Sequence, residues 1–245
     1  MSDKPTTSFD SPAPTGPSQE ALKAAHELFV SLAMQEASKV VLDNAKDVLP
    51  FFKGLLPESD RASGILSFAF IECQISEIFS QHLDPKAPGG LESIVGQNGI
   101  LDNVGSRLRM LRALNWLGDK TFNDLRLLAH IRNRFAHSPI SLTYDDDTVR
   151  GYASSLEKHE TKFLYKYPDV VLSPKQLHLV RSIMTLFFTY EDLVLRPSSI
   201  RAGFGATGAF SAPADCLPIQ LQYALGWCID TVFAIYSDAQ KAHGG

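Results

Sequence analysis

The sequence predicts an all-α fold, a helical bundle of six or seven helices with a central helical hairpin. Apolar residues recur every three or four positions in several long stretches, which is the spacing of one face of a helix. Strand-like alternation is scarce, and no period of about 20–50 residues repeats. Hydrophobic residues make up 44% of the 245 positions, which is typical of a globular protein. We therefore expect a disordered tail at 1–17 and a single helical domain at 18–245.

Charge and cysteine content exclude several functional classes. The formal net charge of -4 argues against a protein that coats nucleic acid through bulk positive charge. Cys73, Cys216 and Cys228 lie far apart, so they favour neither a disulfide framework nor a zinc site. The N-terminus lacks the pattern of a secretory signal, and no stretch supplies the ~20 clean apolar residues of a membrane span. We expect a cytoplasmic protein with no membrane insertion, no metal and no cofactor.

Two long helices are predicted in the N-terminal part of the chain. Residues 1–17 contain four prolines and little that could be buried, which predicts disorder. A first helix is expected over 18–43. A second begins at Ser59 or Asp60 and ends near His82. This second helix is apolar on most sides, so we expect it to lie in the centre of the bundle.

Residues 100–117 and 121–137 predict two antiparallel helices. Leucines at helical spacing share one side of each segment. The three-residue loop between them is short enough to form a helical hairpin, and Asp119 or Thr121 is expected to cap the second helix. Pro139 ends that helix, because the residue before a proline avoids helical angles.

Capping residues and composition predict the remaining elements. An acidic turn at 144–147 begins a short helix, and Pro174 marks the first position of a longer one. Residues 196–218 are rich in Gly, Ala, Ser and Pro, which predicts a loop. The other expected elements are a short segment at 91–95, a helix over 148–159, an extended segment at 162–172, a helix over 174–195 and a last helix over 219–241.

Residues 132–137 read RNRFAH and form the clearest candidate for a catalytic site. The planar guanidinium of Arg132 could clamp a phosphate, while His137 exchanges a proton with a 2′-hydroxyl or a leaving oxygen and Asn133 orients the pair. The two side chains lie about 140° apart on an ideal helix. They converge only if the helix ends at His137 or if a second chain brings its own pair alongside. In the alternative interpretation, Arg132 forms a structural ion pair and His137 caps the helix end.

The predicted hairpin is basic although the chain is acidic. Residues 107–137 contain seven cationic side chains and two carboxylates, a net charge of +5 that leaves -9 for the rest of the chain. Such a surface could receive an anion, a nucleic-acid backbone or an acidic protein partner. Arg126, His130 and Arg134 recur every four residues and form one ridge. The alternative is a solvated helix face with local ion pairs.

Arg107, Arg109 and Glu72 complete the candidate binding residues. Arg107 and Arg109 point about 200° apart on an ideal helix, so one of them should reach inward. Glu72 lies in the apolar helix that begins at Ser59 or Asp60, where a carboxylate needs a partner. We expect that partner to be an arginine of the hairpin, with Arg109 and Arg132 as the candidates.

Residues 203–208 spell GFGATG, which matches the dinucleotide-binding pattern G-x-G-x-x-G. That pattern binds a dinucleotide only between a strand and a helix. No strand is predicted before it and prolines follow it, so we expect a flexible loop.

Two blocks of the sequence resemble known families. IRNRFAHS, at 131–138, resembles the R-x4-H signature of the HEPN superfamily, which includes many metal-independent ribonucleases. A longer stretch, about 60–195, resembles the bacterial mannitol operon repressor family. It includes GILDNVGSRLR at 99–109, the hairpin through 137 and the acidic turn TYDDD at 143–147. This resemblance implies an all-helical fold and regulation of sugar-alcohol uptake without a helix-turn-helix reader. The tail 1–17 and the residues after 196 depart from the family pattern.

Three functions stay open at this point. The leading expectation is a cytoplasmic negative regulator of transcription of a sugar-alcohol transport operon, which acts as a homodimer through a protein partner or nucleic acid bound at 107–137. The alternative is a metal-independent ribonuclease or toxin module that uses Arg132, Asn133 and His137. In the third, a helical scaffold, Arg132 and His137 only hold the hairpin.

Overall fold

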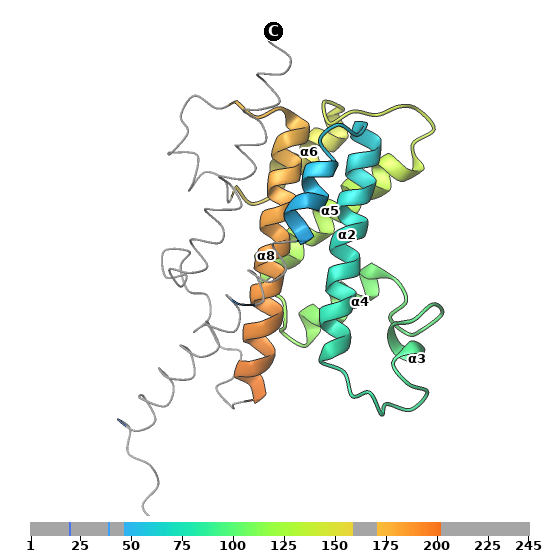
Figure 1. The fold of residues 1–245 in the computed structure, drawn as a ribbon, viewed down its shortest axis with the longest axis vertical. Coiled ribbons are helices and arrows are strands. Elements are labelled where there is room, and N and C mark those ends of the chain that lie inside the picture. The colour runs from blue at the N-terminus through green and yellow to red at the C-terminus, as the bar shows by residue number, and fades with distance from the viewer. Residues whose placement is uncertain (1–19, 21–38, 40–46, 159–170, 202–245) are drawn as a thin grey trace, which may run out of the picture.

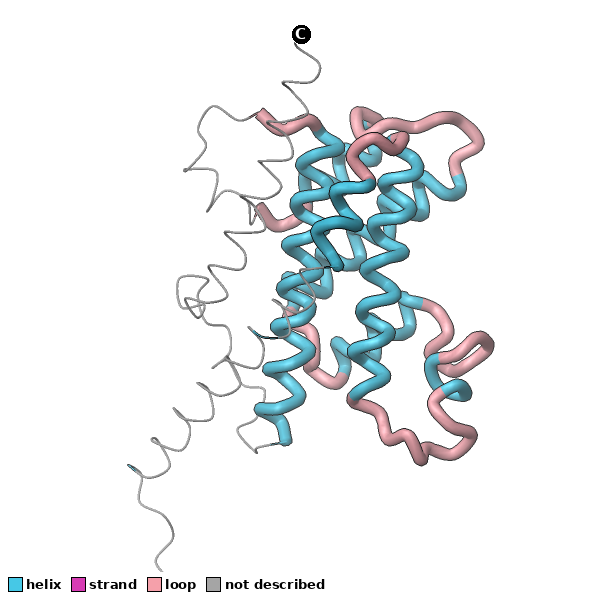
Figure 2. The backbone as a smooth tube through the Cα atoms, in the orientation of Figure 1, coloured by secondary structure: helices cyan, strands magenta, loops and turns pink. Residues whose placement is uncertain are grey.

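The computed structural model describes Glu20, Lys39 and residues 47–158 and 171–201. These residues form helices joined by loops and turns, without a strand among them (Figure 2), which confirms the all-α fold. The labelled helices in Figure 1 are α2 (Asp60–Gln81), α3 (Glu92–Val95), α4 (Val104–Ala113), α5 (Asp119–His137), α6 (Asp147–Ser155) and α8 (Pro174–Arg201).

α2 is the predicted central helix, and its two ends are the predicted ones. The Ser59 side chain accepts a hydrogen bond from the Ala62 N–H at 3.2 Å, which caps the helix start. His82 is the C-cap residue. In Figure 1, α2 and α8 run side by side with the helical residues 47–54 in front of them and α5 behind. The segment 47–54 was not predicted as a helix, because Pro50 falls inside it.

α2 is also the one described helix that is long and apolar enough to cross a membrane, judged by length and composition. Core helices of water-soluble proteins share these properties. Eight residues of α2 are buried in the bundle. Length and composition are therefore weak evidence for a membrane span.

The hairpin consists of α4 and α5, but α4 is shorter than predicted. Asn103 caps its start by accepting a hydrogen bond from the Ser106 N–H at 2.9 Å, so residues 100–103 stay outside the helix. Asn115 has a φ of 56°, and this left-handed conformation ends the helix.

The start of α5 is held by another helix. Gly118, not Asp119 or Thr121, is the N-cap residue, and its N–H donates to Asp192 Oδ2 on α8 at 2.8 Å. Asp192 also pairs with Arg196 at 2.6 Å. Beside it, burial and the Asp192 charge raise the pKa of Glu191 to about 7, although Arg196 opposes the shift. At its other end, α5 stops at His137 before Ser138 and Pro139, as predicted.

α6 and α8 begin where the sequence predicts, but each ends at a residue other than the predicted one. The Asp146 side chain accepts from the Thr148 N–H at 3.1 Å and caps α6. α6 ends at Ser155, short of the predicted 159. α8 continues past 195 to Arg201, with Pro197 inside the helix. Pro197 is buried, so packing outweighs the hydrogen bond that a proline cannot donate.

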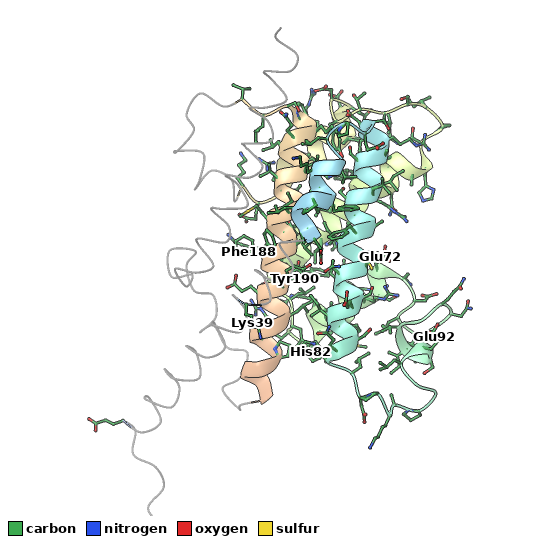
Figure 3. All side chains as sticks on the ribbon, viewed as in Figure 1. Lys39, Glu72, His82, Glu92, Phe188 and Tyr190 are labelled. Atoms are coloured by element: carbon green, nitrogen blue, oxygen red, sulfur yellow. The ribbon has the colours of Figure 1, made fainter. Side chains whose placement is uncertain are left out.

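The core is formed where α2, α5 and α8 meet. The side chains of Phe68, Ile71, Ile131, Phe135 and Phe187 are almost fully buried there. α5 contacts α2, α4, α6 and α8, so it joins these helices into one bundle. Tyr190 points from α8 toward α2 (Figure 3), and its hydroxyl donates to Gln74 Oε1 at 2.6 Å.

A buried polar cluster crosses this core. The Ser63 and Tyr144 hydroxyls lie 3.2 Å apart, and Ser67 Oγ lies 3.4 Å from His178 Nε2. Burial raises the pKa of the Tyr144 hydroxyl above its usual range. Burial, together with the charge of Arg181, lowers the pKa of His178 to about 3. His178 is therefore neutral at physiological pH.

Several predictions lie outside the described residues. They are the tail 1–17, most of the helix 18–43, most of the extended segment 162–172, the loop 202–218 with the GFGATG pattern, the last helix 219–241, Cys216 and Cys228. Cys73 is exposed and free.

Candidate functional site

The candidate site is built on α5. Leu125, Leu128, Ile131 and Phe135 recur at helical spacing and pack into the core, with relative exposures of 1% or less. This packing fixes the rotation of the helix about its axis. The residues on the opposite side therefore face solvent.

Arg107 reaches inward from α4, as predicted for one of the two arginines. Its Nε donates to the Leu101 carbonyl at 2.7 Å, and its Nη2 donates to the carbonyls of Val95 and Asp102 at 2.9 and 3.0 Å. Its Nη1 donates to Ser76 Oγ at 2.5 Å. These bonds join the 95–102 loop to α2. They engage the guanidinium within the chain, and the expectation that Arg107 contacts a partner stays a prediction.

Glu72 lies halfway along α2 (Figure 3), and its partner is Arg107. Glu72 Oε1 lies 3.9 Å from Arg107 Nη1. The expected partners were Arg109 or Arg132. The register of α4 turns Arg107 toward α2 and Arg109 away from it, which explains the difference. Glu72 is thus part of the same internal contact as Arg107.

The other cations at the loop of the hairpin have local partners. Arg112 pairs with Asp119, and Lys120 lies 3.2 Å from Glu157. Arg109 is exposed, and its Nη2 donates to Ser106 Oγ at 3.3 Å. The positive charge predicted for the hairpin is therefore reduced near its loop.

Three cationic or titratable side chains remain on the outer face of α5. Arg126, His130 and Arg134 are all exposed, and we call them the α5 strip. Within the described chain, neither arginine has an acidic partner. The Arg126 guanidinium lies 5.7 Å from the centre of the Phe122 ring, a cation–π contact. The predicted ridge of Arg126, His130 and Arg134 is present. Among the described residues, its arginines lack the carboxylate partners that Arg112 and Lys120 have near the hairpin loop.

Tyr152 of α6 adds an aromatic surface to the α5 strip. Its ring stacks on His130 with centroids 5.4 Å apart and an angle of 20° between the planes. The sequence offered no signal for Tyr152, because the contact depends on how α6 packs against α5.

The R-x4-H pair lies at the last turns of α5. Arg132 is half-buried, and its Nη1 donates to Asn133 Oδ1 at 2.9 Å. Arg132 Nε is buried and has no hydrogen-bond partner among the described residues. His137 is the last residue of the helix and is exposed. The structural ion pair of the alternative interpretation is not formed by Arg132 in this part of the chain.

α5 stays helical through His137, which decides how the pair is arranged within one chain. Five residues along a continuous helix separate two side chains by about 140°. Arg132 accordingly lies beside the packed face and His137 lies on the solvent side. The helix ends at His137, which is one of the two conditions under which the pair was expected to converge. A second copy of the chain that brings its own pair alongside is the other condition.

Comparisons with known proteins give no family assignment. No family model matches the chain, and neither a curated protein nor a solved structure matches it. The resemblances to the mannitol operon repressor family and to the HEPN superfamily therefore stay expectations. Among the described residues, no group of three or more His, Cys, Asp and Glu side chains could hold a metal ion.

Proposed function

We propose that this chain is a cytoplasmic regulatory protein that lowers transcription of a sugar-alcohol transport operon by binding a partner. The proposal starts from the resemblance to the mannitol operon repressor family. The observation that carries it is the α5 strip, whose arginines are exposed and without acidic partners among the described residues. The chain as a whole has a net charge of -4, so exposed arginines that are unpaired in the described part and lie in one strip favour a specific anionic partner. They do not favour a protein that coats nucleic acid through its overall charge.

The test is deletion of the gene combined with a reporter for sugar-alcohol transport operons. We expect transcription of one such operon to rise in the deletion strain and to fall again when the chain is supplied. Affinity purification of the full chain should recover a partner under the same conditions. If no transport operon responds and no partner is recovered, the proposal fails.

The second candidate function is a metal-independent ribonuclease, and one observation favours it. Asn133 orients the Arg132 guanidinium through the bond at 2.9 Å, while His137 is open to solvent at the helix end. Arg132 would hold the scissile phosphate and His137 would transfer the proton. Because five residues along α5 place the two side chains about 140° apart, a homodimer that brings a second pair alongside would favour this function, and sedimentation of the pure protein tests that state.

RNA cleavage in the presence of EDTA tests this second function. If it is correct, cleavage persists with the chelator and falls by ~100-fold or more in His137→Ala. Arg109→Ala, an exposed change outside the pair, should leave the rate unchanged. Intact RNA after long incubation with the wild-type protein would exclude the ribonuclease.

A further inference from the structure

The α5 strip is short and regular. Arg126, His130 and Arg134 follow each other at four-residue intervals, so each step advances about 6 Å along the helix axis and the whole strip spans about 12 Å. All three side chains are exposed. A ligand for this strip therefore needs only a few negative charges, spaced about 6 Å apart.

Carboxylates lie at both ends of the strip. α5 and α6 run in opposite directions, because Tyr152 stacks on His130 while Glu157, just beyond the end of α6, pairs with Lys120 near the start of α5. The start of α6 therefore lies near the end of α5 that carries Arg134. Three acidic residues occupy that start: Asp145, Asp146, which caps α6, and Asp147, which pairs with Arg150. At the other end lie Glu157 and Asp119, which are paired with Lys120 and Arg112.

The carboxylates at the two ends of the α5 strip distinguish between two kinds of anionic partner. A nucleic-acid backbone carries closely spaced charges along its whole length, so it would run past the strip onto carboxylates and onto cations that already pair with carboxylates, where it gains little attraction. A protein helix with Glu or Asp at every fourth position has the same interval of about 6 Å and can end its charged stripe where the strip ends.

We propose that the α5 strip docks an acidic helix of a partner protein, which carries Glu or Asp at three successive fourth positions along one face. Arg126 and Arg134 meet the outer two carboxylates, and Tyr152, stacked against His130, provides a flat surface for the aliphatic carbons between them. This inference rests on the proposed regulatory function, since it names the chemistry of the partner.

Binding of labelled helical peptides to the full chain tests the proposal. The first peptide is alanine-based and has glutamates at positions i, i+4 and i+8. The second has the same composition with its glutamates on three different faces, and the third carries lysines in place of the striped glutamates. A single-stranded oligouridylate serves as the nucleic-acid probe. Fluorescence anisotropy at low ionic strength measures each affinity.

We expect the striped glutamate peptide to bind the wild-type chain best. Arg126→Glu combined with Arg134→Glu should weaken this binding by at least ~10-fold and should gain affinity for the lysine peptide. The control is Lys86→Glu, a charge reversal at an exposed cation in the turn after α2, which should change neither affinity. If the double charge reversal does not fold, Arg126→Gln with Arg134→Gln should show the same loss for the glutamate peptide.

Equal binding of the two glutamate peptides, or no gain for the lysine peptide, would overturn the proposal. Tighter binding of the oligouridylate through the same arginines would also overturn it in favour of a nucleic acid. The deletion reporter is independent of these peptides. If the reporter responds while the peptides fail, the docking inference falls and the regulatory function stands.

Discussion

Arg107 and Arg109 are two residues apart in one helix and have different roles. Arg107 is 8% exposed and donates to four oxygens of α2 and the 95–102 loop. Arg109 is exposed, and its Nη2 donates to Ser106 Oγ. A helix turns by about 100° per residue, so neighbours of identical chemistry meet opposite environments. The inward arginine serves stability, and only the outward one is available to a partner.

Replacing Arg107 with alanine should lower the free energy of unfolding by about 3 kcal/mol. The change leaves Glu72 without its cation and leaves the carbonyls of the 95–102 loop without donors. Arg109→Ala should change the same quantity by less than about 0.5 kcal/mol. Urea unfolding followed by circular dichroism compares the two, and equal effects would contradict the assigned roles.

His178 gives the described core a dependence on pH. Its folded pKa of about 3 lies below the unfolded value of about 6.5, so protonation favours the unfolded chain. This contribution to stability is complete above the unfolded pKa. It is lost as the pH falls from about 6.5 toward 3, at up to ~1.4 kcal/mol per pH unit.

His178→Gln should remove this part of the pH dependence. Unfolding free energies of the wild type and the variant, measured from pH 7 to pH 4, should differ most at pH 7 and converge as the pH falls. Carboxylates that titrate in both proteins cancel in the comparison. A difference that stays constant over this range would show that His178 is not buried and neutral.

At the scale of elements, α2 and α5 approach closely at one glycine. A Cβ atom at Gly64 would lie 2.4 Å from Phe135 Cδ2, and the Phe135 ring is fully buried. Only a residue without a side chain allows this distance. Arg61 reinforces the contact from the first turn of α2, where its Nη2 donates to the Ala136 carbonyl at 3.2 Å.

Gly64→Ala should therefore destabilise the fold by about 1–3 kcal/mol through overpacking. Gly151→Ala is the matched control, because Gly151 lies in α6 and a Cβ atom there would have no neighbour within 4 Å. That change should be neutral or stabilising by up to about 1 kcal/mol, since alanine favours helices. Thermal unfolding of both variants checks the order, and a stabilising Gly64→Ala would contradict the close packing.

The elements differ in how well the sequence predicted them. The start and end of α2 follow from Ser59 and His82, because local capping decides them. The early end of α4 depends on the left-handed conformation of Asn115, which spacing does not reveal. The chain is helical around Pro50 and Pro197 although a helix interior disfavours proline. Packing of these helices outweighs that local preference.

The candidate site was predicted only where one helix determines it. The ridge of Arg126, His130 and Arg134 follows from the period of α5 alone. The partner of Glu72 and the stacking of Tyr152 depend on how different helices pack, and no spacing in the sequence contains that information. The sequence therefore predicts the α5 strip, but it does not predict the contacts that Glu72 and Tyr152 make with other helices.

For the whole molecule, the distribution of charge decides which function we favour. Salt bridges and internal hydrogen bonds engage the cations near the hairpin loop, whereas the α5 strip keeps its charge on an acidic chain. Arg132 is half-buried beside the packed face of α5 while His137 is exposed, so the exposed arginines of the α5 strip support partner binding more directly than the pair supports catalysis. This asymmetry makes a binding function the leading proposal.

Complementation of the deletion strain tests this account most directly. Transcription of the responding transport operon is measured with the wild-type chain, with Arg126→Glu combined with Arg134→Glu, and with Lys86→Glu. We predict that the wild type and Lys86→Glu restore repression, and that the double variant, expressed at an equal level, does not. Full repression by the double variant would contradict the claim that the outer face of α5 binds the partner.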